Sequence, residues 1–163
     1  FPQYLFPLRG DNLEGRCEVS PRSSETIPVL VVEPSETDLQ ELRFIFGGTD
    51  WELYEAQDMR QALTLLDRRP FSVVISEREL PAGTWEDLLQ ASQARPRPPY
   101  LVVSSRCADN HLWADVLNLG GWDVLAKPFQ ANEVRRVVRL AWLRWRRQWE
   151  TGWEHPDQFA VAV

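Results

Sequence analysis

The chain has 163 residues, a net charge of −6 at pH 7, 44% hydrophobic residues and 26% charged residues. These values fit one globular domain of average size. No apolar run approaches the length of about 18 residues that a membrane span needs. Two cysteines and two histidines form neither a metal-binding spacing nor a disulfide framework. We therefore expect a cytoplasmic protein without a membrane partner.

The sequence pattern divides the chain into three parts. Residues 1–27 are rich in proline and glycine and have no sustained period, which predicts an irregular N-terminal arm. Residues 28–150 alternate between short apolar runs and amphipathic segments, as expected for one folded domain. Residues 151–163 are predicted to form a C-terminal tail.

The first half of the domain predicts two strands, each followed by a helix. The continuous apolar run Val29–Val32 is typical of a buried strand. A helix is expected over residues 35–46, ending at a pair of glycines. Trp51–Ala56 alternates in character, as a half-exposed strand does, and Asp58 can cap the next helix. The buried stripe predicted for that helix consists of Met59, Ala62, Leu65 and Leu66.

The second half repeats the alternation. Val73–Ser76 and Tyr100–Ser104 are predicted strands. Thr84 can cap the helix between them, with an acid three residues later to complete a capping box. A helix over Asp109–Leu119 is expected to turn Leu112, Val116 and Leu119 inward.

The last predicted elements are a short strand at Val124–Ala126 and a long helix from Ala131 to about Trp149. Five apolar strands, each followed by a helix, predict a parallel sheet covered on both faces. Such a sheet binds its ligands at the carboxyl ends of the strands. The polar residues expected at these ends are Glu33, Glu77, Ser105 and Lys127.

The order of these residues resembles the receiver domain of two-component signalling over roughly residues 28–148. The resemblance rests on the apolar run ending in Glu33, the segment Ser-Val-Val-Ile-Ser-Glu-Arg-Glu-Leu-Pro at 72–81, the hydroxyl of Ser105, and Lys-Pro-Phe at 127–129. It implies an α/β, flavodoxin-like, doubly wound fold whose five parallel strands have the order 2-1-3-4-5.

The resemblance also implies roles for the strand-end residues. In receivers, the residue that matches Glu77 is an aspartate that accepts a phosphoryl group. Two acids after the first strand help that aspartate to hold Mg²⁺, and the residues that match Ser105 and Lys127 contact the phosphoryl oxygens. Here Glu33 keeps the first acid, whereas Pro34 has replaced the second. We therefore expect Mg²⁺ binding at Glu33 to be weak, and no other cofactor.

The leading hypothesis is a non-enzymatic pseudo-receiver that acts by protein contact in signal transduction or transcriptional control. In it, Glu77 pairs with Lys127, reaches toward Ser105 and fixes one signalling state. An ordinary ion pair without a switching role is the alternative explanation of the same two residues. Two other functions remain open: a phosphorylatable response regulator with an atypical acid, and a small-molecule-binding flavodoxin-like protein. The sequence disfavours the last because no glycine-rich loop follows the first strand.

The long final helix predicts a contact surface. Trp142, Trp145 and Trp149 continue its apolar stripe, and six arginines but only two glutamates lie between residues 131 and 150. Because Trp and Arg are enriched at interface hot spots, we expect a homodimer or a protein partner such as a sensor kinase or an output protein. In the alternative, the tryptophans cover the sheet. The acidic body, with an isoelectric point of about 5.0, disfavours nucleic acid as the partner.

Overall fold

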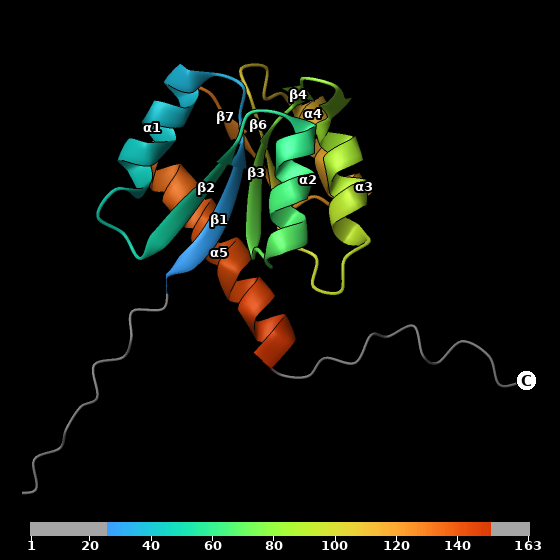
Figure 1. Ribbon diagram of the computed structural model, residues 1–163. Coiled ribbons are helices and arrows are strands. Elements are labelled where there is room, and N and C mark those ends of the chain that lie inside the picture. Colours follow the sequence, from blue (N-terminus) through green and yellow to red (C-terminus); the bar gives the residue numbers. More distant parts are fainter. Residues whose placement is uncertain (1–25, 151–163) are drawn as a thin grey trace, which may run out of the picture.

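The computed structural model describes residues 26–150 (Figure 1). Five strands form one parallel sheet in the order β2-β1-β3-β6-β7. Counted along this sheet, the order is the predicted 2-1-3-4-5. The bounds of the five strands are Ile27–Val32 (β1), Trp51–Ala56 (β2), Val73–Glu77 (β3), Tyr100–Ser105 (β6) and Asp123–Ala126 (β7).

Five helices are present among the described residues, and they cover both faces of the sheet (Figure 1). Helices α2, α3 and α4 pack on one face, whereas α1 and α5 pack on the other. Their bounds are Glu36–Phe46 (α1), Met59–Arg68 (α2), Trp85–Gln93 (α3), Asn110–Leu119 (α4) and Ala131–Glu150 (α5). Within residues 26–150, no helix is both long enough and apolar enough to cross a membrane.

The central strand β1 explains why two layers of helix are needed. Its successive side chains point to opposite faces, and both faces are apolar. Leu30 and Val32 join the core beneath α2, α3 and α4, and Val29 and Val31 join the core beneath α1 and α5. All four are completely buried. A continuous apolar run is thus the pattern of a strand covered on both sides.

Each of the first four helices begins at a side chain that caps it. Ser35, Asp58, Thr84 and Asp109 accept hydrogen bonds from backbone amides of the first turn of α1, α2, α3 and α4, respectively. Thr84 and Asp87 form the predicted capping box. These caps satisfy amides that would otherwise lack acceptors, and they fix the helix starts next to the carboxyl ends of the strands.

The prediction that Leu119 turns inward was wrong, since its side chain is 53% exposed. Leu119 is the last residue of α4, and the chain then turns at Gly120, whose φ is 97°. The turn brings Gly121 against Val116, with its amide 2.8 Å from the Val116 carbonyl oxygen. A β-carbon at residue 121 would lie only 2.5 Å from Val116 Cγ1. The backbone of Gly121 therefore covers Val116 where a third inward side chain, that of Leu119, was expected.

Two further features were not predicted. Strand β1 begins at Ile27, two residues earlier than the apolar run suggested. A small antiparallel pair, β4 (Glu79–Leu80) with β5 (Gly83–Thr84), follows β3 directly. The predicted arm and tail lie almost entirely outside the described residues.

Candidate functional site

The ammonium group of Lys127 lies at the carboxyl ends of the strands and contacts three carboxylates. Its Nζ atom donates to Glu33 Oε2 at 2.5 Å and to Asp38 Oδ2 at 2.9 Å. It also donates to Glu77 Oε2. The Lys127, Glu33 and Asp38 side chains are almost fully buried, whereas that of Glu77 is 19% exposed. We call these four residues the lysine cluster.

The lysine cluster shifts the pKa values of two of its members. Burial raises the pKa of Glu33 above its ordinary value, although the hydrogen bond from Lys127 partly opposes this effect. Burial acts to lower the pKa of Lys127, but its hydrogen bonds to Glu33, Glu77 and Asp38 outweigh burial and raise that pKa. Lys127 is therefore a cation at neutral pH, as its carboxylate surroundings require.

Glu33 enters the lysine cluster from the end of β1. Its backbone amide donates to Ala56 O of β2 at 2.9 Å, which extends the strand pairing by one residue. Its other carboxylate oxygen, Oε1, accepts from the Ser35 amide at 3.0 Å. Pro34 lies between these two residues and offers no side-chain oxygen. The carboxylate is thus held by the start of α1 as well as by Lys127.

Asp38 is the site residue that the sequence analysis missed. It lies in the first turn of α1, and its amide donates to the hydroxyl of Ser35, the cap of that helix. The side chain is buried, and its Oδ1 also accepts from Arg106 NH2 at 3.0 Å. The Ser35-x-x-Asp38 spacing is a sequence signal for a helix start. It contains no signal that the aspartate also turns toward Lys127.

Glu77 and Ser105 lie at the ends of the neighbouring strands β3 and β6. Glu77 Oε1 accepts from the Arg78 amide at 2.9 Å, so both of its oxygens have partners. The predicted pairing of Glu77 with Lys127 is confirmed. Ser105 is buried, and its hydroxyl accepts from the Cys107 amide at 3.1 Å. No hydrogen bond joins Ser105 to Glu77 in this geometry.

The predicted site residues share one open hollow of about 520 Å³ at the carboxyl edge of the sheet. Besides the lysine cluster, the hollow is lined by Pro34, Ser35, Arg78, Glu79, Ser105, Arg106 and Cys107. Within residues 26–150, no three His, Cys, Asp or Glu side chains are arranged to hold a metal ion. Mg²⁺ requires near-octahedral oxygen ligands, and the lysine cluster, with its ammonium group between the carboxylates, does not fit it.

The three tryptophans predicted to form an interface lie in the distal part of α5 and are all half-buried. Trp142 packs against the core beneath α1 and α5. The Trp145 indole donates to Pro98 O at 3.1 Å. The Trp149 ring lies 6.5 Å from that of Trp145 and beneath Arg97. Each therefore contacts its own domain, but only Trp142 packs against the core on the sheet, as the alternative expected of all three. The interface role stays a prediction.

Known proteins that resemble this chain have the fold described above. Residues 29–139 match the model of the response regulator receiver domain. That match covers more than half of the chain, so the chain belongs to the receiver domain family, a family of signalling modules in two-component systems. A receiver domain is a signalling module rather than a conventional enzyme.

The relatives give the same family and add the fold. The chain is 31% identical over 115 residues to the response regulator protein PilR of Pseudomonas aeruginosa, a match covering 69% of this chain and 25% of PilR. The chain thus spans about a quarter of the length of that relative. The signal receiver domain of an HD domain-containing protein from Pseudomonas fluorescens Pf-5 is 28% identical, with a TM-score of 0.70 over 77% of this chain and 93% of that one. The receiver domain of a putative LuxO repressor from Vibrio parahaemolyticus is 20% identical and shows the same fold, with a TM-score of 0.73 over 78% of this chain and 98% of that one.

Proposed function

We propose that this chain is a pseudo-receiver, a receiver domain that acts through protein contact without accepting a phosphoryl group at its acidic site. The observation that carries the proposal is the position of Lys127, whose ammonium group contacts Glu33, Asp38 and Glu77 together. In this hypothesis the lysine supplies, from within the chain, the positive charge that a receiver otherwise takes from a divalent cation.

The composition of the site supports this hypothesis in two ways. Pro34 removes one oxygen ligand, and Mg²⁺ is usually held by one or two carboxylates together with water and phosphate oxygens. The ammonium group of Lys127 is tethered to the chain, so a metal ion would have to displace a buried partner from all three carboxylates. We therefore expect millimolar Mg²⁺ to leave the lysine cluster intact.

The geometry of Glu77 supports the same conclusion. Its side chain is one methylene longer than that of an aspartate, and a displacement of about 1 Å from the reactive position already costs a large factor in rate. Both carboxylate oxygens are engaged, one by Lys127 and one by the Arg78 amide. A phosphoryl donor would have to displace Lys127 from one oxygen or the Arg78 amide from the other before that oxygen could attack.

A fixed lysine cluster implies a fixed signalling state. The partner, either a sensor kinase or an output protein, would then recognise a surface that does not change with phosphorylation. Several large apolar side chains are exposed and available for such contact: Phe44, Trp113, Leu117, Leu119 and Leu140. We place the module in the cytoplasm, where the exposed free thiol of Cys107 stays reduced.

A second candidate function is a phosphorylatable receiver with glutamate as the acceptor. One observation favours it: the hollow of about 520 Å³ is open to solvent and brings Glu77, Ser105 and Lys127 to one surface. A small phosphoryl donor therefore has access to the site. The two functions differ in whether a covalent product forms at Glu77.

Intact-mass measurement after incubation with acetyl phosphate and Mg²⁺ distinguishes them. The pseudo-receiver hypothesis predicts no gain in mass for the unmodified chain and none for Glu77→Gln, which lacks an acceptor carboxylate. A gain of one phosphoryl group in the unmodified chain that Glu77→Gln abolishes would establish the second function. A gain in both proteins would show that another residue is modified, which is consistent with Glu77 accepting no phosphoryl group.

A further inference from the structure

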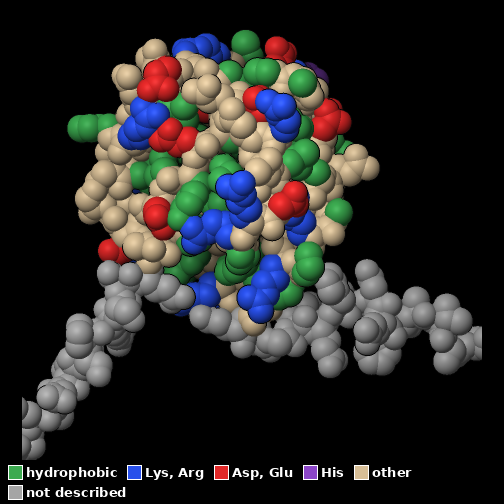
Figure 2. Space-filling view, in the orientation of Figure 1, with side chains coloured by type: hydrophobic (Ala, Val, Ile, Leu, Met, Phe, Trp, Pro, Cys, Tyr) green, Lys and Arg blue, Asp and Glu red, His purple; other side chains and the backbone are tan. Residues whose placement is uncertain are grey.

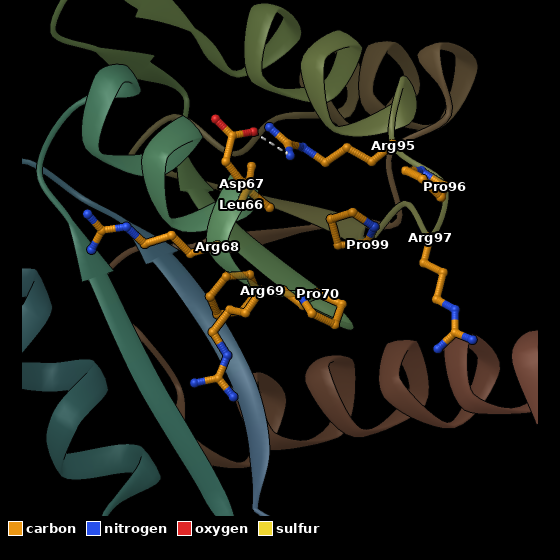
Figure 3. A pocket seen from close by; sticks show the side chains of 10 residues that line it. Leu66, Asp67, Arg68, Arg69, Pro70, Arg95, Pro96, Arg97 and Pro99 are labelled. Carbon is orange, nitrogen blue, oxygen red and sulfur yellow. Dashed lines mark hydrogen bonds and ion pairs between the residues drawn. The ribbon is translucent and has the colours of Figure 1, made fainter.

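A second hollow, of about 370 Å³, lies at the opposite edge of the sheet. It is formed by the end of α2 with its link to β3 and by the link between α3 and β6, so it lies at the amino ends of those strands (Figure 3). The lysine cluster lies at the other end of β3. We call this hollow the arginine cleft, and its lining is Leu66, Asp67, Arg68, Arg69, Pro70, Phe71, Arg95, Pro96, Arg97 and Pro99.

The inner wall of the arginine cleft is apolar and stiff. Phe71 and Pro99 are buried, and Pro70 and Pro96 stand beside them. Proline fixes its own φ angle near −65°, so these two links have little conformational freedom to lose when a ligand binds. A preformed wall lowers the entropic cost of association. The volume of the cleft is at the lower end of the roughly 300–1,000 Å³ range of ligand pockets.

The rim of the arginine cleft is basic. Four arginines line it against a single acid, Asp67, which pairs with Arg95 at 2.8 Å. Arg69 and Arg97 lie on either side of Pro70 and Pro99 and extend toward α5 (Figure 3). Arg68 and Arg97 are exposed to solvent. In Figure 3 the guanidinium groups of Arg69 and Arg97 flank the apolar wall, whereas that of Arg68 extends from the end of α2 toward β2.

Two contacts hold the rim in place. The Arg69 guanidinium stacks over the Tyr54 ring, 4.3 Å from its centroid, and donates to the Tyr54 hydroxyl. The Arg97 guanidinium lies 5.7 Å from the centroid of the Trp149 ring. Cation–π contacts of this kind orient an arginine and leave part of its fork of donors for an anion. In addition, Arg95 Nε is buried with no hydrogen-bond acceptor among the described residues.

The charge of the rim contrasts with that of the molecule. The whole chain carries a net charge of −6, yet basic side chains gather over the lower part of the face in Figure 2, where α2, the amino ends of the strands and α5 meet. A local positive surface on an acidic protein attracts an acidic ligand while the rest of the surface repels it. Charge alone would therefore direct an acidic ligand to this part of the surface.

We propose that the arginine cleft binds an acidic segment of a partner protein. One aromatic or aliphatic side chain of the segment packs between Pro70 and Pro99, and flanking carboxylates pair with Arg68 and Arg97. The apolar wall favours a peptide over a nucleic acid, whose phosphates would gain nothing from it. This proposal does not depend on the proposed function, because the cleft and the lysine cluster lie at opposite edges of the sheet.

Fluorescence anisotropy with a labelled probe peptide tests the proposal on the full chain. The probe is an acidic heptapeptide with a central phenylalanine, and its controls carry alanine at the centre or amides in place of the acids. The test variant is Arg68→Gln with Arg97→Gln. The matched control is Arg60→Gln with Arg144→Gln, which removes the same charge from exposed positions on α2 and α5 outside the cleft.

We expect the test variant to weaken binding of the probe by about fivefold to tenfold, as two charged contacts at a solvent-exposed rim would. The control variant should change the affinity by less than about twofold, and both control peptides should bind more weakly than the probe. Equal losses in the two variants would reduce the effect to net charge and overturn the proposal. The proposal would also be overturned if the probe showed no saturable binding at millimolar concentration. It would be overturned as well if a single-stranded oligonucleotide bound more tightly than the probe through Arg68 and Arg97.

Discussion

Lys127 is the only lysine in the 163-residue sequence, and its ammonium group is buried among three carboxylates. Burying one charge costs several kcal/mol unless partners compensate for it. Three carboxylates around one ammonium leave an excess of negative charge, which Arg106 reduces by binding Asp38 from the solvent side. One buried cation and one exposed cation thus face the three carboxylates, which leaves one negative charge when all three are ionised.

Removing the buried cation should therefore be costly. We expect Lys127→Met to lower the free energy of unfolding by about 3–5 kcal/mol, because Glu33 and Asp38 would lose a buried counter-charge. The double variant Lys127→Met with Glu77→Gln should recover part of that loss. Urea denaturation measures both effects, and Arg144→Met, which removes an exposed cation, should change stability by no more than about 0.5 kcal/mol. Strictly additive effects of the two substitutions would contradict the pairing of Glu77 with Lys127.

The pKa of Glu33 predicts a dependence of stability on pH. Burial raises this pKa in the folded protein above its ordinary value of 4.5, so the folded state holds the proton more tightly than the unfolded state does. The resulting contribution to stability is full below pH 4.5 and is lost as the pH rises through the folded pKa. The difference in unfolding free energy between the unmodified chain and Glu33→Gln should fall as the pH rises from 4.5 toward neutrality. A difference that grows over this range in urea denaturation would mean that the attraction of Lys127 outweighs burial.

Sequence reasoning found four site residues because each one follows an apolar run. Glu33, Glu77, Ser105 and Lys127 end strands or directly follow them, and parallel strands bring such ends to one edge. Asp38 lies within an amphipathic helix, so its own neighbourhood predicts only a helix start. Its contact with Lys127 depends on how α1 packs on the face of the sheet, which is set by contacts between residues distant in the chain.

At the scale of elements, the β4–β5 pair shapes the loop beside Glu77. Each strand has only two residues, too few to show the alternation by which a strand is predicted. Leu80 is buried beneath the turn, and the Trp85 amide donates to Arg78 O at 3.2 Å. The pair thereby holds the backbone next to Glu77 and leads into the cap of α3.

The turn of this pair contains a residue with an unfavourable backbone conformation. Ala82 has a φ of 62°, in the left-handed region that costs a residue with a β-carbon about 1–2 kcal/mol. We expect Ala82→Gly to raise the free energy of unfolding by about 0.5–1 kcal/mol in urea denaturation. Ala94→Gly is the matched control: residue 94 has a φ of −72°, so glycine there should destabilise by a similar amount. Loss of stability in both variants would show that Ala82 is not strained.

At the scale of the whole molecule, the two edges of the sheet differ in charge. The carboxyl edge carries the lysine cluster, and the amino edge carries the arginine cleft. The sequence indicated basic character only in the long last helix, where the arginines are close together in the chain. The arginines of the cleft come from the end of α2 with its link to β3 and from the link between α3 and β6, about 27 residues apart. Patterns within local segments therefore could not bring them together.

The oligomeric state of the chain tests the remaining role of the α5 tryptophans. If Trp145 and Trp149 also meet a second copy, light scattering should show a dimer at tens of micromolar. Trp145→Ala with Trp149→Ala should then lower the mass to that of a monomer. Circular dichroism must show that the variant stays folded, because Trp145 also bonds to Pro98. A monomeric unmodified chain would mean that these tryptophans serve only their own domain.

In the proposed pseudo-receiver, Lys127 is held by the three carboxylates and is not released to a phosphoryl group. Because the chain has a single lysine, an amine-reactive label followed by peptide mass spectrometry reports on this side chain directly. We predict that Lys127 is labelled far more slowly in the folded protein than in the urea-unfolded protein, and that acetyl phosphate with Mg²⁺ leaves the rate in the folded protein unchanged. Equal labelling in the folded and unfolded proteins, or a change in the folded rate when acetyl phosphate and Mg²⁺ are added, would contradict it.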